Sequence, residues 1–470
     1  MSSEAGASRR SLPGDLAAVV SNELSRRHLP AIEESLLRQV FETLFYVSLR
    51  TEEGQPITCH VVYLDPEDLW LQTQEQRPHQ SWSFIPFASS IAFTESSLTK
   101  LAKATDPRSS SIAVYPDESG TLSILGLVDQ GNSFLGYVNH ERQRGFAPPG
   151  VFQASIEGTG RIAAYSMLRK IAELSGGDLL DRQAPVFERG PIQSFLMERI
   201  QEESVHLISE RLQERYGEPV PFNPEFLYRF WISMLSRLLL RAKAYRHGGA
   251  VLLGTGIADD TLRLKYELFY PRLRMAIPKL AFQSIVDDIS RKQMVRGEQV
   301  TATNESIYPK GATLTALATT AQLVETEQEI DDAIWFISTL TRVDGLVFLD
   351  SFLGLHGFGG EIRVDQDPPR LFLAGDAEGS VENRRELDPE RYGMRHRSML
   401  RWCWISPQGV GFVISQDGDV RAVMRVADGV MLWDNIKLQR AVPSHDFRVT
   451  TRGTVDIVTQ EDIEKAGDTT

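Results

Sequence analysis

The chain has 470 residues, of which 50 are lysine or arginine and 63 are aspartate or glutamate, so its formal net charge is −13. Hydrophobic residues make up 42% of the sequence, as in an ordinary globular protein, and roughly 100–200 residues per domain predicts two or three domains. Proteins that bind nucleic acid or membrane surfaces use a broad basic surface, so this acidic balance argues against both kinds of partner. Any site for an anion must therefore be local.

The two cysteines, Cys59 and Cys403, are far apart in the sequence, and each has apolar or aromatic neighbours. A disulfide framework or a cysteine-rich zinc site is not expected, and a reducing cytoplasm fits best. The first residues, "MSSEAGASRRSLPGD", lack the apolar core of a signal peptide, and no stretch approaches the roughly 18 uncharged apolar residues of a membrane span. We expect a cytoplasmic protein.

The N-terminal part of the chain predicts mixed α/β structure with several β-hairpins. Residues 30–50 begin with helical spacing and run into strand-like "FYVSL". Turn residues then separate apolar strands in "SSIAVYPDESGTLSILGLV" and in "VFQASIEGTGRIAAYS". A helix is expected over residues 162–174, where "IAAYSMLRKIAEL" continues from the second of these hairpins.

The second half of the chain begins with helical periodicity over about 192–246, followed by two apolar strands, "GGAVLLGTGI" and "TLRLKYELFY". Another helix is expected around 278–294, before a polar segment at 295–313. The last region opens with the helix "TEQEIDDAIWFISTLTRV" and the apolar strand "GLVFLDSF". The stretches "HGGAVLLGTGI" and "VDGLVFLDSFLGLHG" share a glycine followed by an apolar strand, a pattern that a distant internal repeat would leave.

These patterns predict a mixed α/β fold with the main domain boundary near 305–315. The polar ends of the chain are typical of disordered tails. The predicted divisions are a tail over 1–14, an α/β region with several hairpins over 15–305, a mixed β-sheet flanked by helices over 310–448, and a tail over 449–470, and the sequence also suggests a further split of the second division near 175–195.

The first candidate for chemistry is Asp344–Gly345–Leu346, which follows a helix and directly precedes the apolar strand. As a structural feature, Asp-Gly is a common turn dipeptide. As a functional one, it places a carboxylate at a sheet edge, and its glycine lets a ligand approach the backbone closely. The dipeptide alone favours the turn.

The second candidate is "GMRHRS", Gly393 to Ser398, in front of a helical run. A glycine that leads into a helix leaves backbone N–H groups and the positive end of the helix dipole open to an anion. Arg395 and Arg397 add guanidinium groups that can each hold phosphate oxygens by two hydrogen bonds, which would make a triphosphate site. The alternative is a solvated basic turn that pairs with the acidic stretch "ENRRELDPE" just before it.

The third candidate follows the apolar strand "VGFVI" and consists of Ser415, Gln416, Asp417 and Gly418. Asp417–Gly418 favours a simple hairpin turn. A hydroxyl and a carboxylate at a strand end would also suit a divalent cation or a ribose.

Together the three motifs resemble those of the diadenylate cyclase domain, a family that joins two ATP molecules into cyclic di-AMP. That family has a DGA motif leading into a strand, G-T-R-H-R-A-A opening a helix and S-E-E ending a strand. The matching stretches here are "VDGLVFLD", "YGMRHRSM" and "VISQDGDV", in the same order. The resemblance covers about residues 310–445, and GxRHR is its most specific part.

The resemblance implies a Mg²⁺- or Mn²⁺-dependent nucleotidyltransferase in which Asp344 is catalytic and helps to activate the ATP 3′-hydroxyl. It also implies that two copies of the chain face each other, in a homodimer or larger homo-oligomer, because each ATP must attack the other. The implied ATP-binding residues are Gly345, Leu346, Gly393, Met394, Arg395, His396, Arg397 and Ser415, and the implied metal ligands are Asp344 and Asp417.

The chain departs from the family pattern at several motif positions. Met394 replaces threonine and so removes a hydroxyl contact to phosphate, while Gln416 replaces a carboxylate and leaves the metal fewer ligands. Leu346 replaces alanine, and this bulkier side chain could narrow the nucleotide pocket.

The N-terminal region shows no catalytic constellation, and single histidines such as His206, His247 and His356 favour structural or surface roles. In layout this region resembles the DACNV sensor domains that precede some diadenylate cyclase domains, which implies an unknown ligand or protein partner. Three functions stay open: a regulated diadenylate cyclase, a catalytically degenerate regulator that binds ATP or a cyclic dinucleotide, and a structural protein with a fortuitous RHR.

Overall fold

The computed structural model divides the chain into two compact units, Met1–Arg182 and Gln183–Thr470. The division falls within the range 175–195 in which the sequence suggested a split. The predicted main boundary near 305–315 is wrong, because the large sheet of the second unit takes strands from both sides of it. The residues that the structure describes are 10–26, 29–67, 82–107, 109–130, 152–166, 169–180, 183–254, 261–300, 310–415, 419–438, 447–449 and 455–457.

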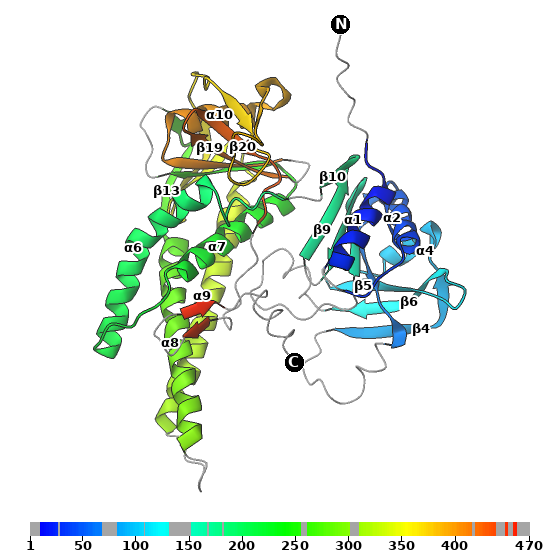
Figure 1. Ribbon diagram of the computed structural model, residues 1–470, viewed down its shortest axis with the longest axis horizontal. Helices are drawn as coiled ribbons and strands as arrows, with labels where there is room; N and C mark the ends of the chain where they lie inside the picture. The colour runs from blue at the N-terminus through cyan, green and yellow to red at the C-terminus, as the bar shows by residue number, and fades with distance from the viewer. Residues whose placement is uncertain are drawn as a thin grey trace. The chain divides into compact units, whose positions relative to one another are not determined.

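The first unit is built on an eight-stranded sheet with the strand order β10-β9-β8-β7-β3-β5-β6-β4. Figure 1 labels β4, β5, β6, β9 and β10 of this sheet. β3 and β5 are parallel neighbours, and the remaining pairs among the described strands are antiparallel. The strands are β3 (Cys59–Tyr63), β4 (Ser83–Ala92), β5 (Ser110–Pro116), β6 (Leu122–Asp129), β7 (Phe152–Gly158), β8 (Arg161–Ser166), β9 (Arg169–Ser175) and β10 (Asp178–Leu180), and a separate hairpin joins β1 (Thr51–Glu52) and β2 (Gln55–Pro56).

The helices of this unit are α1 (Pro13–Arg26), α2 (Glu34–Ser48) and α4 (Glu95–Ala102). They share a buried apolar cluster with the sheet, in which Leu16 of α1 and Phe41 of α2 pack with Ile156 of β7. Phe41 meets Phe152 edge-on, with ring centroids 5.6 Å apart. Full burial of side chains of this size stabilises the unit by about 1.5–3 kcal/mol each.

Two local predictions in this unit are wrong. The expected helix over 162–174 is instead the hairpin of β8 and β9. Ile162 lies in the cluster beneath the helices and its neighbour Ala163 does not, yet both are buried, so the alternation typical of a strand is hidden in the sequence. The strand-like "FYVSL" is mostly helical, because Leu44, Val47 and Ser48 continue the buried face of α2 while Tyr46 is exposed.

The second unit has a ten-stranded sheet with the order β12-β15-β14-β11-β18-β19-β20-β16-β17, and β13 also pairs with β15. The strands are β11 (Gly249–Gly254), β12 (Leu262–Arg263), β13 (Tyr266–Tyr270), β14 (Leu346–Asp350), β15 (Leu355–Ile362), β16 (Leu371–Leu373), β17 (Arg385–Glu386), β18 (Gly409–Ile414), β19 (Val420–Val426) and β20 (Gly429–Trp433). The helices are α6 (Pro191–Tyr216), α7 (Glu225–Ala244), α8 (Arg272–Val300), α9 (Lys310–Leu340), the 3-10 helix η2 (Pro389–Arg391) and α10 (Met394–Ile405), and a small hairpin joins β21 (Phe447–Val449) and β22 (Val455–Ile457).

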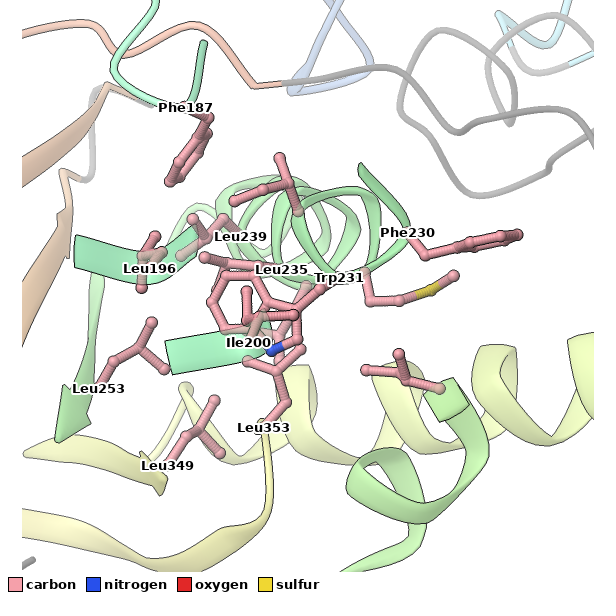
Figure 2. Close-up of a cluster of buried hydrophobic side chains, with 14 of the residues drawn as sticks. Phe187, Leu196, Ile200, Phe230, Trp231, Leu235, Leu239, Leu253, Leu349 and Leu353 are labelled. Carbon is pink, nitrogen blue, oxygen red and sulfur yellow. The ribbon is translucent and has the colours of Figure 1, made fainter. Parts of the chain in front are cut away.

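Helices cover both faces of this sheet, which confirms the predicted mixed α/β class. Helices α6 to α9 share the larger buried cluster with one face, and Figure 2 shows Trp231 of α7 with Leu253 of β11 and Leu349 of β14 in it. Helix α10 covers the other face, where Met399 and Trp402 pack in a second cluster. The central strands are therefore buried on both sides, which explains why they read as continuous apolar runs.

Helices α8 and α9 run side by side from the sheet, as Figure 1 shows. Both agree with helices expected from the sequence, although each is longer than expected. Among the helices that the structure describes, none combines the length and the apolar character needed to cross a membrane. The predicted tail over 1–14 overlaps the start of α1, and most of the predicted tail over 449–470 lies outside the described residues.

The two glycine-then-strand stretches that suggested a repeat are β11 and β14. They are parallel neighbours, and Val251 lies opposite Val347. Since β11 also pairs with β18 on its other side, the strand from residues 249–254 lies between β14, which follows the first motif, and β18, which precedes the third.

Candidate functional site

Asp344 and Gly345 lie immediately before β14, as the sequence predicted. Gly345 has φ +112°, and a Cβ there would lie 2.6 Å from the carbonyl carbon of Gly359 in the neighbouring segment β15. Only glycine fits this close backbone approach. The turn therefore holds the exposed Asp344 at the start of the strand.

Leu346 occupies a different place from the one that the resemblance implied. Its side chain is 4% exposed and belongs to the cluster beneath α10, where its Cδ1 fills the space that a Cβ on Gly360 would need. The leucine therefore packs in the core, so the expectation that it narrows a pocket has no support in its position. Only its backbone lies at the sheet edge.

The GxRHR motif opens α10, as predicted, with Gly393 as the N-cap residue. Glycine has no side chain to cap the helix, so the N–H groups of Met394 and Arg395 gain no side-chain partner and can bind a ligand, whereas the N–H of His396 donates to the carbonyl of Gly393 over 3.0 Å. Nothing lies within 4 Å of a Cβ built on Gly393, and Met394 beside it is 76% exposed. The helix start is therefore an open surface, with Arg397 exposed and Arg395 partly buried.

The rest of α10 is anchored firmly to the sheet. Its Met399 fits against Gly411 of β18, where a Cβ would lie 2.2 Å from the Met399 sulfur. Cys403 is buried, and its Sγ donates to the carbonyl of Val423 over 3.4 Å. Burial raises the pKa of the Cys403 thiol to about 12, so this cysteine is a packing residue.

Ser415 follows β18, as predicted, at the turn into β19. Its backbone N–H donates to the carbonyl of Asp419 over 2.9 Å, which closes the turn. Asp417, the predicted metal ligand, and Gln416 lie outside the described residues.

The strand register places the three motifs at one edge of the sheet. β11 runs parallel to β14, with Val251 opposite Val347, and antiparallel to β18, with Gly249 opposite Ile414. The start of β14 and the end of β18 are therefore on the same side, two strand spacings or roughly 10 Å apart. The N-terminus of α10 lies at this edge as well, because His396 contacts the beginning of β19.

Charged side chains of both signs, the carboxylate of Asp344 and the guanidinium groups of Arg395 and Arg397, lie at this edge of the sheet. Within the described part of the chain, the side chains of Asp344, Arg395 and Arg397 form no ion pair or hydrogen bond. Charged groups left without partners at a surface can bind charged ligands, since no internal pair has to be broken first. The arrangement suits a ligand that carries phosphate groups toward α10 and a cation or hydroxyl toward Asp344.

His396 is held differently from the two arginines. Its Nε2 lies 3.1 Å from Nη1 of Arg421 on β19, and the Arg421 Nε donates to the carboxylate of Asp434. Tyr392 packs on the imidazole with ring centroids 5.4 Å apart. Burial lowers the pKa of His396 to about 4, and the nearby Arg421 acts in the same direction, so this ring is neutral at pH 7.

The sequence did not point to Arg421, Asp434 or Tyr392 as parts of the site. Arg421 and Asp434 are on strands or turns whose neighbours depend on the sheet register. Tyr392 directly precedes the motif, so its proximity was the one local signal.

Of the two predicted metal ligands, only Asp344 is among the described residues. No group of three or more histidine, cysteine, aspartate or glutamate side chains in the described ranges is arranged to hold a metal. Mg²⁺ is commonly bound by one or two carboxylates together with substrate phosphates, so the exposed and unpaired Asp344 fits such a site. The second predicted carboxylate, Asp417, is outside the described residues.

A second polar cluster lies at the opposite end of β14 and has a structural role. Asp350 accepts backbone N–H bonds from Phe352 and Gly354 at 2.8 and 2.9 Å. Its other oxygen lies 3.0 Å from Nη1 of Arg274 and 3.1 Å from Nε2 of His356. Both oxygens of Asp350 therefore have partners within the protein, and these bonds stabilise the β14–β15 turn. His356 is one of those partners, which agrees with the structural role expected for it.

Comparison with known families places one part of the chain. A family model described as "Probable sensor domain DACNV" matches residues 26–129, from the end of α1 through β6. The DACNV resemblance is thus confirmed for these residues, which all lie in the first unit. No curated protein matches the chain.

Proposed function

We propose that the second unit is a diadenylate cyclase that condenses two ATP molecules into cyclic di-AMP, and that the DACNV-type unit senses a ligand or partner and adjusts this activity. The observation that carries the proposal is the common edge at which the strand register gathers Asp344, the GxRHR helix start and Ser415. A fortuitous RHR on a structural protein would have no reason to share an edge with the other two motifs.

The residues of this edge suggest how ATP is bound. The first N–H groups of α10, those of Met394 and Arg395, and the guanidinium groups of Arg395 and Arg397 hold the triphosphate, because both present donors and positive charge to the oxygens. His396 adds a neutral N–H donor. This orientation leaves the ribose toward Asp344 at the start of β14.

The reaction requires two chains that face each other. Each ATP 3′-oxygen attacks the α-phosphorus of the other ATP. Each attack forms one P–O bond, breaks the bond between the α-phosphorus and the oxygen that bridges it to the β-phosphate, and releases one pyrophosphate, while the hydroxyl proton passes to solvent. Asp344 accepts a hydrogen bond from the hydroxyl and so orients it for attack. A bound Mg²⁺ or Mn²⁺ would neutralise phosphate charge, and positioning together with charge neutralisation supplies most of the rate in such transfers.

The test is to incubate the purified chain with ATP and either Mg²⁺ or Mn²⁺ and to measure cyclic di-AMP by mass spectrometry. We expect Asp344→Asn to abolish product while ATP still binds. Because the reaction needs two chains, product formed per chain should fall on dilution. Product that forms equally well with Asp344→Asn would contradict the proposed mechanism.

Calorimetry with a non-hydrolysable ATP analogue tests the phosphate grip. Arg395→Ala and Arg397→Ala should each weaken binding by about 10- to 100-fold, since each removes charged hydrogen bonds. Arg401→Ala is the matched control on the same helix, because Arg401 already pairs with Asp367 at 2.6 Å. Binding that depends on both arginines without any product would favour the regulator over the cyclase, and no binding at all would overturn both.

A further inference from the structure

Arg421 lies between the GxRHR helix and the turn after β20. Its Nη1 lies 3.1 Å from Nε2 of His396, its Nε donates to Asp434, and its Nη2 is 3.6 Å from Asp419. The arginine side chain is 17% exposed, and its guanidinium also lies over the ring of Tyr392, 5.8 Å from the centroid. All three guanidinium nitrogens therefore face protein groups.

This geometry decides the state of His396. Arginine carries only donors and stays charged in proteins, so the imidazole Nε2 that faces it must accept. A ring that accepts at Nε2 is neutral and carries its proton on Nδ1. The charged and titratable groups around the ring are Arg421 and Asp434 from the sheet side and Arg395 and Tyr392 from its own segment.

We propose that Arg421, held by Asp434, is a positioning residue that fixes His396 as an Nδ1–H donor for the nucleotide phosphates. The proposal rests on the proposed nucleotide site and extends it to a residue outside the three motifs. Arg421 acts through His396 and does not grip phosphate itself, since its nitrogens already have partners.

The chain offers a matched control on the same strand. Arg425 lies four residues further along β19, donates to the carbonyl of Trp404 over 2.9 Å and stacks on the Trp404 ring, 4.3 Å from the centroid. Both arginines thus contact α10 from β19, Arg421 at the start of the helix and Arg425 at its end. If the arginines acted only by anchoring α10, either variant would weaken nucleotide binding, whereas loss of His396 positioning weakens it only in the Arg421 variant.

The first experiment compares the binding of a non-hydrolysable ATP analogue to the full chain at pH 7.5 and pH 5.5. We expect Arg421→Met to weaken binding about tenfold at pH 7.5, because the donor is no longer fixed. At pH 5.5 this variant should lose less affinity relative to wild type than at pH 7.5. Removal of the adjacent cation raises the pKa of His396, although burial still lowers it, so a larger fraction of the rings takes up a proton and donates from both nitrogens. Arg421→Lys should retain part of the wild-type affinity, and Arg425→Met should bind like wild type at both pH values.

The second experiment reads the tautomer of His396 directly in the full chain, without nucleotide, from long-range ¹H–¹⁵N spectra assigned with His396→Gln. We expect the Nδ1–H form at pH 7 in wild type and a mixture in Arg421→Met. The proposal is overturned by an Nε2–H tautomer in wild type, by unchanged binding in Arg421→Met, or by an equal loss in Arg425→Met. If wild type does not bind the nucleotide, the proposed function is overturned together with this role of Arg421. If wild type binds it and Arg421→Met binds it equally well, only the positioning role is overturned.

Discussion

His60 on β3 stays neutral in mild acid, where an exposed histidine would be protonated, because its side chain is buried. The side chain is 3% exposed and stacks near the ring of Tyr165, with centroids 6.3 Å apart. Burial lowers the pKa of His60 to about 4, while the carboxylate of Glu157 opposes this shift and Lys170 adds to it. The neutral ring is therefore part of the folded state of the sensor unit.

The lowered pKa of His60 predicts acid sensitivity of the first unit. Between pH 6.5 and 4 the unfolded chain binds a proton at this histidine and the folded chain does not, so stability falls as pH falls. The loss should approach about 1.4 kcal/mol per pH unit. Amide exchange of peptides from β3 and β7, corrected for intrinsic rates, measures it in the full chain.

The variant His60→Gln should remove this part of the pH dependence. Peptides from β14 in the second unit serve as the internal control, because their opening should not respond to His60. An undiminished slope in His60→Gln would show that another group causes the acid sensitivity.

Single residues of the candidate site were predictable to different degrees. Asp344 and the two arginines of GxRHR stood out, because charged residues beside glycine at the border of an apolar segment interrupt the local pattern. Arg421 gave no such signal, since a charged residue near the start of a strand is common at a surface. Its role follows from the register that sets β19 beside α10.

Two motif glycines, Gly345 and Gly393, each stand at the start of a strand or helix in the sequence, but the structure gives them different roles. Gly345 has φ +112° and would press a Cβ against the backbone of Gly359, whereas Gly393 has φ −65° and open space around it. The first glycine is therefore required by geometry. The second is required only if a ligand approaches the helix start.

These two glycines predict a clear contrast between alanine variants. Gly345→Ala should destabilise the β14–β15 pair by about 1–3 kcal/mol or more, because the strained φ and the backbone clash cannot be relieved by a side-chain movement. Gly393→Ala should cost less than about 1 kcal/mol, the usual effect at a helix N-cap. Amide exchange of peptides from β14 and β15 measures the first effect, and peptides from α10 measure the second. Equal effects at both positions would contradict this account.

Some elements were misread from the sequence for a physical reason. β8 and β9 are buried on both faces, so their apolar residues do not alternate and resemble a helix in the periodicity. The end of α2 is rich in aromatic and β-branched residues, which favour strands, yet its helical face is completed by packing on the sheet. In both places tertiary burial outweighed local preference.

At the scale of the whole molecule, the division at Arg182 separates the sensor-type unit from the unit with the candidate site. Each large sheet is contained within one unit. A chain cut at this division should therefore keep both hydrophobic cores intact.

Two fragments test where the functional unit begins. Residues 183–470 should fold and bind an ATP analogue as tightly as the full chain, because the whole ten-stranded sheet is present. Residues 310–470 should not fold, since β11 is lost from between β14 and β18 and leaves both strands unpaired on one side. Circular dichroism and calorimetry compare the fragments, and a folded, nucleotide-binding 310–470 would show that β11 is dispensable.

The sequence by itself determined the local setting of each motif: a tight turn before a strand at Asp344, a helix start at Gly393 and a turn after a strand at Ser415. Such settings depend on glycine conformation and capping, which involve only a few neighbouring residues. Only the tertiary structure decided that the three settings share one edge, that Leu346 packs in the core and that Arg421 holds His396. Those facts depend on which strands pair and in which direction, and apolar strands buried on both faces carry no local mark of their partners.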